Sequence, residues 1–305
     1  MKASYAHYTL HFRQPAGTSR GVLTDKETYF LKLEDEDMPG VFGLGECAVF
    51  RGLSADDVPA YEDKLRELCA NISADKETDL HEFPSIRFGL ETAINDFANG
   101  CRRQPFPSDF TEGMSAIPIN GLVWMGTKEE MLHRIDDKIK AGFTTIKLKV
   151  GAIDTESELD LVRHIRKVFP PEVLTIRLDA NGGFTPDNAL QKLSDFARYG
   201  IHSIEQPIKQ GQWEAMQRIC TESPIDIALD EELIGIHTPE RMGEMLDAVR
   251  PKYIILKPSL IGGFSGSQDW IMQAARRDIG GWVTSALESN VGLNAIAQWT
   301  AQLGA

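Results

Sequence analysis

The chain has 305 residues, of which 42% are hydrophobic, enough for one large domain or for a barrel with a smaller partner domain. Its 32 basic and 45 acidic residues give a net charge of −13, which argues against nucleic-acid binding, because that function needs clustered lysine and arginine. No apolar run reaches the roughly 18 residues of a membrane helix, the N-terminus has no signal-peptide pattern, and the four scattered cysteines form no CxxC pair. We therefore expect a cytoplasmic protein with reduced thiols, and the sequence leaves its oligomeric state open.

The first part of the chain, residues 1–113, has the pattern of a small α+β domain. Polar and apolar residues alternate, as they do in half-buried antiparallel strands, over Tyr5–Phe12, Val22–Thr24 and Thr28–Glu34. The segment Phe42–Cys47 follows a turn at Pro39-Gly40. Helices are expected over Asp56–Ala70, with Ser54 as a candidate N-cap, and over Phe88–Arg102.

A proline-containing, poorly periodic stretch from Gln104 to Ala116 is typical of a linker. Beyond it, in residues 114–305, short β-rich runs alternate with helical segments. The expected strands are Ile117–Val123, Thr144–Val150, Leu174–Asp179, His202–Glu205, Asp226–Asp230, Tyr253–Lys257 and Gly281–Ser285. Seven strand–helix units predict a parallel sheet closed into a TIM barrel of the (β/α)7β type, with residues 1–113 as its α+β cap.

An open, doubly wound sheet is the alternative architecture. It usually carries a glycine-rich phosphate loop after its first strand, and Gly121–Gly126 matches that loop poorly. A closed barrel also needs an eighth strand. The expected helix Val291–Leu303 comes just before Ala305, so we expect the last strand to be missing from this chain, either trimmed or replaced by an open edge.

Ionisable residues end five consecutive expected strands of the barrel: Lys149, Asp179, Glu205, Asp230 and Lys257. They recur every 25 to 30 residues, which is the length of one strand, one helix and two loops. The C-terminal ends of barrel strands form the face on which active sites lie. One such residue alone is more often a solvated strand end, but the joint spacing favours a functional site.

Strand parity places these charges inside the barrel. In Ile146–Val150 the apolar side chains share one face, whereas Lys147 and Lys149 share the other. Because helices cover the outside of a barrel, we expect the apolar face to point outward and the lysines to point into the barrel mouth. Lone buried ammonium groups are very unfavourable, so nearby carboxylates and a divalent cation are expected to compensate.

The residue types indicate metal-assisted removal of a proton. Asp179, Glu205 and Asp230 offer the oxygen ligands that Mg²⁺, or Mn²⁺ in its place, prefers, and no His or Cys joins them as zinc would require. A metal on a substrate carboxylate stabilises the charge that forms when the neighbouring C–H proton leaves. Lys149 is the candidate base, beside the positive charges of Lys147 and the metal, and Lys257 is a second base or a fixed cation.

Five motifs together resemble those of the muconate-lactonizing branch of the enolase superfamily: Lys147-Leu-Lys149, Asp179-Ala-Asn181, Glu205-Gln-Pro207, Asp230-Glu231 and Lys257-Pro258. The resemblance covers both parts of the chain, since that family places an α+β cap on its barrel. It implies a lysine base, Mg²⁺ and a small carboxylate substrate.

Further motifs resemble the o-succinylbenzoate synthase family within that branch: Gly43-Leu-Gly-Glu46, Arg87-Phe-Gly-Leu-Glu91, Ile117-Pro-Ile-Asn-Gly121 and Ser285-Ala-Leu-Glu-Ser289. This resemblance implies a carbon–oxygen lyase of menaquinone biosynthesis. Lys149 would take a proton from a cyclohexadiene carboxylate, hydroxide would leave, and Lys257 would stabilise the anion. By the same resemblance, Lys147, Arg177 and Asn181 support the site, and Ser285 and Ser289 lie near the substrate.

Two other functions stay open at this point. An N-acylamino acid racemase or dipeptide epimerase of the same superfamily would use the same metal, with Lys149 and Lys257 as opposed bases. A catalytically silent barrel that binds a ligand would be indicated by loss of a metal ligand, and all three are present. We also expect two mobile cap loops, Gln14–Gly21 and Phe50–Ser54, to contact the substrate.

Overall fold

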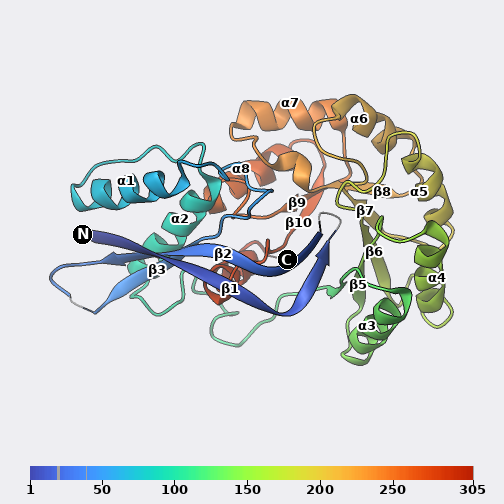
Figure 1. The fold of residues 1–305 in the computed structure, drawn as a ribbon, viewed down its shortest axis with the longest axis horizontal. Helices are drawn as coiled ribbons and strands as arrows, with labels where there is room; N and C mark the ends of the chain where they lie inside the picture. The colour runs from blue at the N-terminus through green and yellow to red at the C-terminus, as the bar shows by residue number, and fades with distance from the viewer. Residues whose placement is uncertain (19–20, 39, 305) are drawn as a thin grey trace.

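The protein is described by a computed structural model that covers residues 1–18, 21–38 and 40–304. Within these residues the strands form two sheets, one antiparallel with three strands and one parallel with seven. The antiparallel sheet belongs to the N-terminal part and lies beside the curled parallel sheet (Figure 1). The α/β fold with an N-terminal cap is thus confirmed, whereas the division between residues 113 and 114 stays a prediction.

The N-terminal part consists of β1 (Lys2–Thr18), β2 (Gly21–Glu34), β3 (Phe42–Cys47), α1 (Tyr61–Ser73) and α2 (Pro84–Ala98). The strands pair in the order β1-β2-β3, and the helices share a core with them that includes Leu31, Tyr61 and Ile86. The pairing of β1 with β2 shifts register between His11 and Ala16 and then continues to Thr18 and Gly21. The hairpin of β1 and β2 is therefore longer than the alternation of polar and apolar residues predicted. Its end extends toward the barrel (Figure 1).

Three local predictions for the cap are wrong. The first helix begins at Tyr61 rather than Asp56, because the Asp56 carboxylate accepts hydrogen bonds from the Ser85 backbone N–H at 2.9 Å and hydroxyl at 2.7 Å. Ser54 is not an N-cap, since its Oγ accepts the backbone N–H of Phe50 at 2.8 Å. The predicted loop Gln14–Gly21 is largely strand, and its residues 19–20 lie outside the described residues.

All seven predicted barrel strands are confirmed: β4 (Gly121–Val123), β5 (Thr145–Lys149), β6 (Thr175–Asp179), β7 (Ser203–Glu205), β8 (Asp226–Leu229), β9 (Tyr253–Leu256) and β10 (Gly280–Val283). They pair in sequential order, so β4 and β10 are the two edges of this sheet within the described residues. The helices that alternate with them are α3 (Lys128–Lys140), α4 (Thr155–Arg166), α5 (Ala189–Ala197), α6 (Trp213–Glu222), α7 (Pro239–Val249), α8 (Gly263–Ala275) and α9 (Asn290–Gln302).

The helices cover the outer face of the parallel sheet, as strand parity predicted (Figure 1). Ile146, Leu148 and Leu178 point into this layer and are at most 1% exposed. Apolar burial of this kind is the main favourable contribution to the fold, at roughly 25 cal/mol per Å². No helix among the described residues is both long and apolar enough to cross a membrane.

Two carboxylates, Glu46, which is buried, and Glu91, which is partly exposed, fasten the cap to N-termini of barrel helices. Glu91 on α2 accepts the backbone N–H groups of Phe264 and Ser265 at the start of α8. Glu46 at the end of β3 accepts the N–H groups of Ser289 and Gly292, both at 2.9 Å, at the start of α9. Unpaired N–H groups and the helix dipole make these ends favourable for a negative charge.

The cap also depends on a close approach between β3 and α2. A Cβ added to Gly45 would lie 1.8 Å from the carbonyl oxygen of Gly89, too close for the backbones to keep this packing. We predict that Gly45→Ala lowers the free energy of unfolding by about 1–3 kcal/mol or more, measured by urea denaturation. As a control, Gly243→Ala in α7 meets the end of the flexible Arg277 side chain. This control should leave the free energy of unfolding unchanged or slightly raised, because alanine favours helix. An equal loss of stability in both variants would contradict the packing argument.

Candidate active site

Strand register brings the predicted charged residues together at the C-terminal edge of the parallel sheet. Lys149 on β5 lies opposite Asp179 on β6, which lies opposite Glu205 on β7. Asp230 directly follows β8, and Lys257 directly follows β9. Side chains alternate between the two faces of a strand, so residues two apart lie on the same face. By this alternation, all five of these side chains lie on the inner face of the sheet.

The three lysines pair with the three carboxylates. Lys147 Nζ lies 2.7 Å from Glu205 Oε2 and 3.1 Å from Asp179 Oδ2, and Lys149 Nζ lies 2.6 Å from the same Asp179 oxygen. Lys257 Nζ lies 2.5 Å from Asp230 Oδ2. Burial alone lowers the pKa of Lys147 and Lys257, but the adjacent carboxylates outweigh it and raise both above their usual value. Lys147 and Lys257 are therefore ammonium ions at neutral pH.

The carboxylates form a group suited to a metal ion. One oxygen from each of Asp179, Glu205 and Asp230 lies within 4.8 Å of the others, and all three residues are buried. Burial raises the pKa of Glu205 to about 8; Lys147 opposes the shift, and Asp179 and Asp230 add to it. Glu205 Oε1 has no hydrogen-bond partner among the described residues. A buried, unpartnered carboxylate oxygen between two other carboxylates fits a divalent cation.

The charge balance supports the same fit. Glu231, 1% exposed, contributes a fourth carboxylate beside the three ammonium groups, so the fully ionised cluster carries one net negative charge. A divalent cation would make it one net positive, and a substrate carboxylate would then neutralise it. The residues present thus fit Mg²⁺ together with a monoanionic group of a ligand.

Asn181 and Gln206 connect the strand ends. Asn181 Oδ1 accepts from Lys149 Nζ at 2.6 Å, and its Nδ2 donates to Glu231 Oε1 at 3.0 Å. Gln206 Oε1 accepts the backbone N–H of Asp230 at 3.1 Å, which links β7 to β8. Both residues adopt positive φ, +43° and +38°, a strained conformation that functional sites often contain.

Gln206 and Glu231 were not among the predicted site residues. Their neighbours in the chain, Glu205 and Asp230, were, and the motifs Glu205-Gln-Pro207 and Asp230-Glu231 contained them. The spacing of residues along the chain cannot distinguish such a neighbour from an ordinary loop residue. The hydrogen bonds of Gln206 to the next strand form only once β7 and β8 are paired.

Three predicted support residues lie outside the carboxylate cluster. The Arg177 guanidinium stacks on the Trp282 ring at 3.9 Å, one inward position below Asp179. Ser289 caps α9, accepting the Val291 N–H and donating to Glu46 Oε2 at 2.6 Å. Ser285 lines a cavity at the side of the sheet. Their predicted roles stay predictions.

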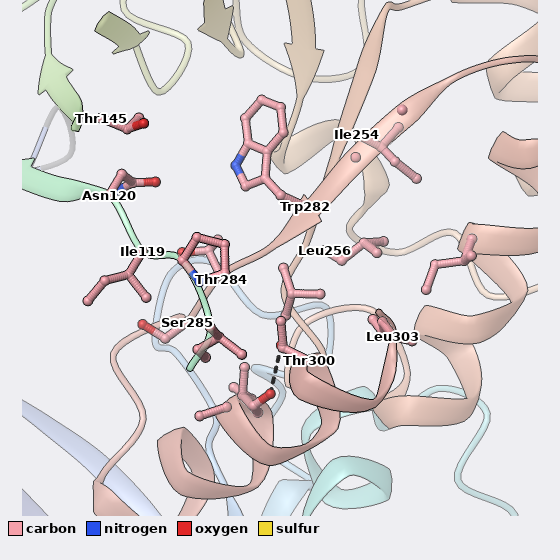
Figure 2. A pocket seen from close by; sticks show the side chains of 18 of the residues that line it. Ile119, Asn120, Thr145, Ile254, Leu256, Trp282, Thr284, Ser285, Thr300 and Leu303 are labelled. Carbon is pink, nitrogen blue, oxygen red and sulfur yellow. Dashed lines mark hydrogen bonds between the residues drawn. The ribbon is translucent and has the colours of Figure 1, made fainter. Parts of the chain in front are cut away.

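This cavity has a volume of about 780 Å³ and lies between β10 and the segment that precedes β4. Figure 2 shows Trp282 on one side of it and Ile119 and Asn120 on the other. In a closed eight-stranded barrel, the last strand pairs with the first and the seventh. The cavity therefore lies at the two edges of the described sheet and is not at the carboxylate cluster.

Comparison with known proteins agrees with this site. Residues 130–305 match the family model described as enolase C-terminal domain-like. The chain is 45% identical over 335 aligned residues to the o-succinylbenzoate synthase of Desulfotalea psychrophila, covering 99% of this chain and 90% of the relative. The crystal structure of MenC from Desulfotalea psychrophila superposes with a TM-score of 0.88 at 41% identity and covers 100% of this chain and 91% of that one.

Two further relatives represent both candidate activities. The o-succinylbenzoate synthase structure from Thermosynechococcus elongatus, with Mg in its active site, is 25% identical with a TM-score of 0.76, and covers 98% of this chain and 88% of that one. The L-Ala-D/L-Glu epimerase of Bacillus subtilis is 30% identical over 86% of this chain and 74% of the relative.

We predict that Asp230→Asn weakens Mg²⁺ binding by about 100-fold or more, since loss of a direct ligand costs at least as much as loss of an outer-shell partner. Isothermal titration calorimetry measures the affinity directly. Asp226→Asn is the matched control, because Asp226 begins the same strand and is exposed; it should bind Mg²⁺ like the wild type. Unchanged affinity in Asp230→Asn would contradict the assignment.

Proposed function

The chain belongs to the enolase superfamily, and we propose that it is a Mg²⁺-dependent carbon–oxygen lyase that forms o-succinylbenzoate in menaquinone biosynthesis. Its substrate would be 2-succinyl-6-hydroxy-2,4-cyclohexadiene-1-carboxylate. The observation that carries the proposal is the pair of largely buried lysines on either side of three carboxylates, in a chain that matches an o-succinylbenzoate synthase over 99% of its length.

We propose Asp179, Glu205 and Asp230 as the ligands of Mg²⁺ (or Mn²⁺). The metal, when bound, stabilises negative charge on the substrate carboxylate while the neighbouring C–H bond breaks. Lys147 contacts two of these carboxylates and is only 7% exposed, so its positive charge is held beside the ligands. It thereby adds to the field that favours an anionic ligand.

Lys149 is the proposed base. Its Nζ is bonded to Asp179 Oδ2 and to Asn181 Oδ1, so two acceptors orient the amine on the β5 side of the cluster. As a neutral amine it would take the proton beside the substrate carboxylate. The resulting ammonium would then return a proton to the hydroxyl that leaves as water, which gives the aromatic ring.

Lys257 is the proposed fixed cation. It follows β9, and three strands separate it from β5 in the sheet, so it faces the cluster from the other side. Asp230 Oδ2 at 2.5 Å keeps it protonated, and its raised pKa suits a charge that stabilises the anion without exchanging protons. An epimerase would instead need both lysines to exchange the substrate proton, one on each face.

The two activities predict different outcomes in D₂O. We expect rapid aromatisation of the cyclohexadiene substrate, which is measured by the change in absorbance. Lys149→Ala and Lys257→Ala should each lower its rate by about 10²–10⁴-fold, the range for loss of a general acid–base group or of a fixed charge. Lys252→Ala is the control, since this exposed lysine precedes β9 at the opposite end of the same strand.

N-succinyl amino acids supply the second arm of this experiment, followed by proton NMR in D₂O. Rapid α-proton exchange on them without aromatisation of the cyclohexadiene would assign the chain to the racemases. Both reactions in one protein would assign a dual activity. Absence of both would contradict catalysis and favour a silent ligand-binding barrel.

A further inference from the structure

Gln206 is fully buried, and all four hydrogen-bonding positions of its side-chain amide are used. Its Oε1 accepts the backbone N–H of Asp230 at 3.1 Å and that of Glu232 at 3.2 Å. Its Nε2 donates to the carbonyl oxygen of Ile208 and to Glu232 Oε2, both at 3.0 Å. An amide offers two acceptor and two donor positions, so the opposite orientation of this side chain would set donors against donors.

This amide joins two of the proposed metal ligands. Gln206 directly follows Glu205, and its side chain binds the backbone N–H of Asp230 itself. Its backbone carbonyl accepts the N–H of Gly182 at 2.7 Å, which ties the loop after β6 to the same point. The spacing between the carboxylates of Glu205 and Asp230 therefore depends on how the Gln206 side chain is held.

Glu232 holds the donor side of the amide. It lies in the short 3₁₀ helix η1 (Glu231–Leu233), two residues after Asp230, and is only 4% exposed. Its Oε2 accepts from Gln206 Nε2, and its Oε1 accepts the backbone N–H of Gly211 at 2.8 Å, in the loop between β7 and α6. Both oxygens of Glu232 thus face N–H donors. An amide in its place would turn an NH₂ group toward one of them.

We propose that Glu232 is a positioning residue for the metal site, which acts through Gln206 and sets the spacing of Glu205 and Asp230. This rests on the proposed function, in which those two carboxylates help to hold Mg²⁺. Hydrogen bonds to an ionised carboxylate are roughly twice as strong as those between neutral groups, so Glu232 fixes one orientation of the amide. Fixed spacing matters to Mg²⁺, because this ion demands near-ideal octahedral geometry at about 2.0–2.1 Å.

Glu232→Gln tests the proposal, because it keeps the shape of the side chain and removes one acceptor. Titration calorimetry with Mg²⁺ should show binding weakened by about 10- to 100-fold, the effect of losing an outer-shell partner of a metal ligand. Glu240→Gln is the matched control, since this exposed glutamate lies in the first turn of the next helix, α7, and should bind Mg²⁺ like the wild type. A Glu232→Gln variant with lower stability in urea but unchanged Mg²⁺ affinity would overturn the proposal, because its role would then be structural only.

A double-mutant cycle separates positioning from the loss of a nearby negative charge. Gln206→Met removes the amide through which Glu232 acts, so adding Glu232→Gln to it should weaken Mg²⁺ binding no further. Additive losses would mean that Glu232 acts by its charge alone, which would overturn the proposal. If Gln206→Met does not give a wild-type circular dichroism spectrum, the electron paramagnetic resonance spectrum of bound Mn²⁺ decides. Glu232→Gln should change that spectrum, because the ligand geometry changes, and an unchanged spectrum would contradict a positioning role.

The metal site itself is tested separately by Asp230→Asn. If Asp230→Asn weakens Mg²⁺ binding and Glu232→Gln does not, the metal site is supported and the role of Glu232 is overturned. If Asp230→Asn binds Mg²⁺ like the wild type, both proposals fail.

Discussion

The structure depends on a cluster of opposite charges buried at the C-terminal ends of parallel strands. Three lysines and three carboxylates lie within 3.1 Å of their partners, with side chains at most 13% exposed. Removing one charge from such a cluster leaves its partner buried and unpaired, which costs several kcal/mol. The register of β5, β6 and β7 sets the contacts, because it places Lys149, Asp179 and Glu205 side by side. The same arrangement that the fold must stabilise is therefore the one that we propose as the site of a divalent cation and an anion.

The cap contributes to the site through its attachment. Glu46 and Glu91 bind the N-termini of α9 and α8, and Phe88 on α2 packs against Phe264 of α8 with ring centroids 5.1 Å apart. These contacts set where the cap sheet lies relative to the strand ends. Phe50, in the second predicted cap loop, belongs to the buried core of the barrel, so this loop is packed against the domain that it covers. The cap is thus fastened beside the strand ends that carry the charged cluster.

Much of this arrangement follows from the sequence, for stated physical reasons. Strand–helix alternation and the regular interval between Lys149, Asp179 and Glu205 predicted the sheet and which residues converge, because parallel strands end at one edge. Contacts between distant segments had no such signal. The hairpin of β1 and β2 continues through a register shift that breaks the alternation, and the Asp56 carboxylate binds α2 instead of opening a helix. The cross-links made by Gln206 and Glu232 likewise exist only in the assembled fold.

The central claim is that the carboxylates of three consecutive strands form one metal site. Crystals grown with Mn²⁺, with diffraction recorded at the manganese absorption edge, test it most directly. The account predicts a single strong anomalous peak bonded to oxygens of Asp179, Glu205 and Asp230, at the roughly 2.1 Å typical of an octahedral hard cation. A peak elsewhere, with Lys147, Lys149 and Lys257 still paired to these carboxylates at full Mn²⁺ occupancy, would contradict it.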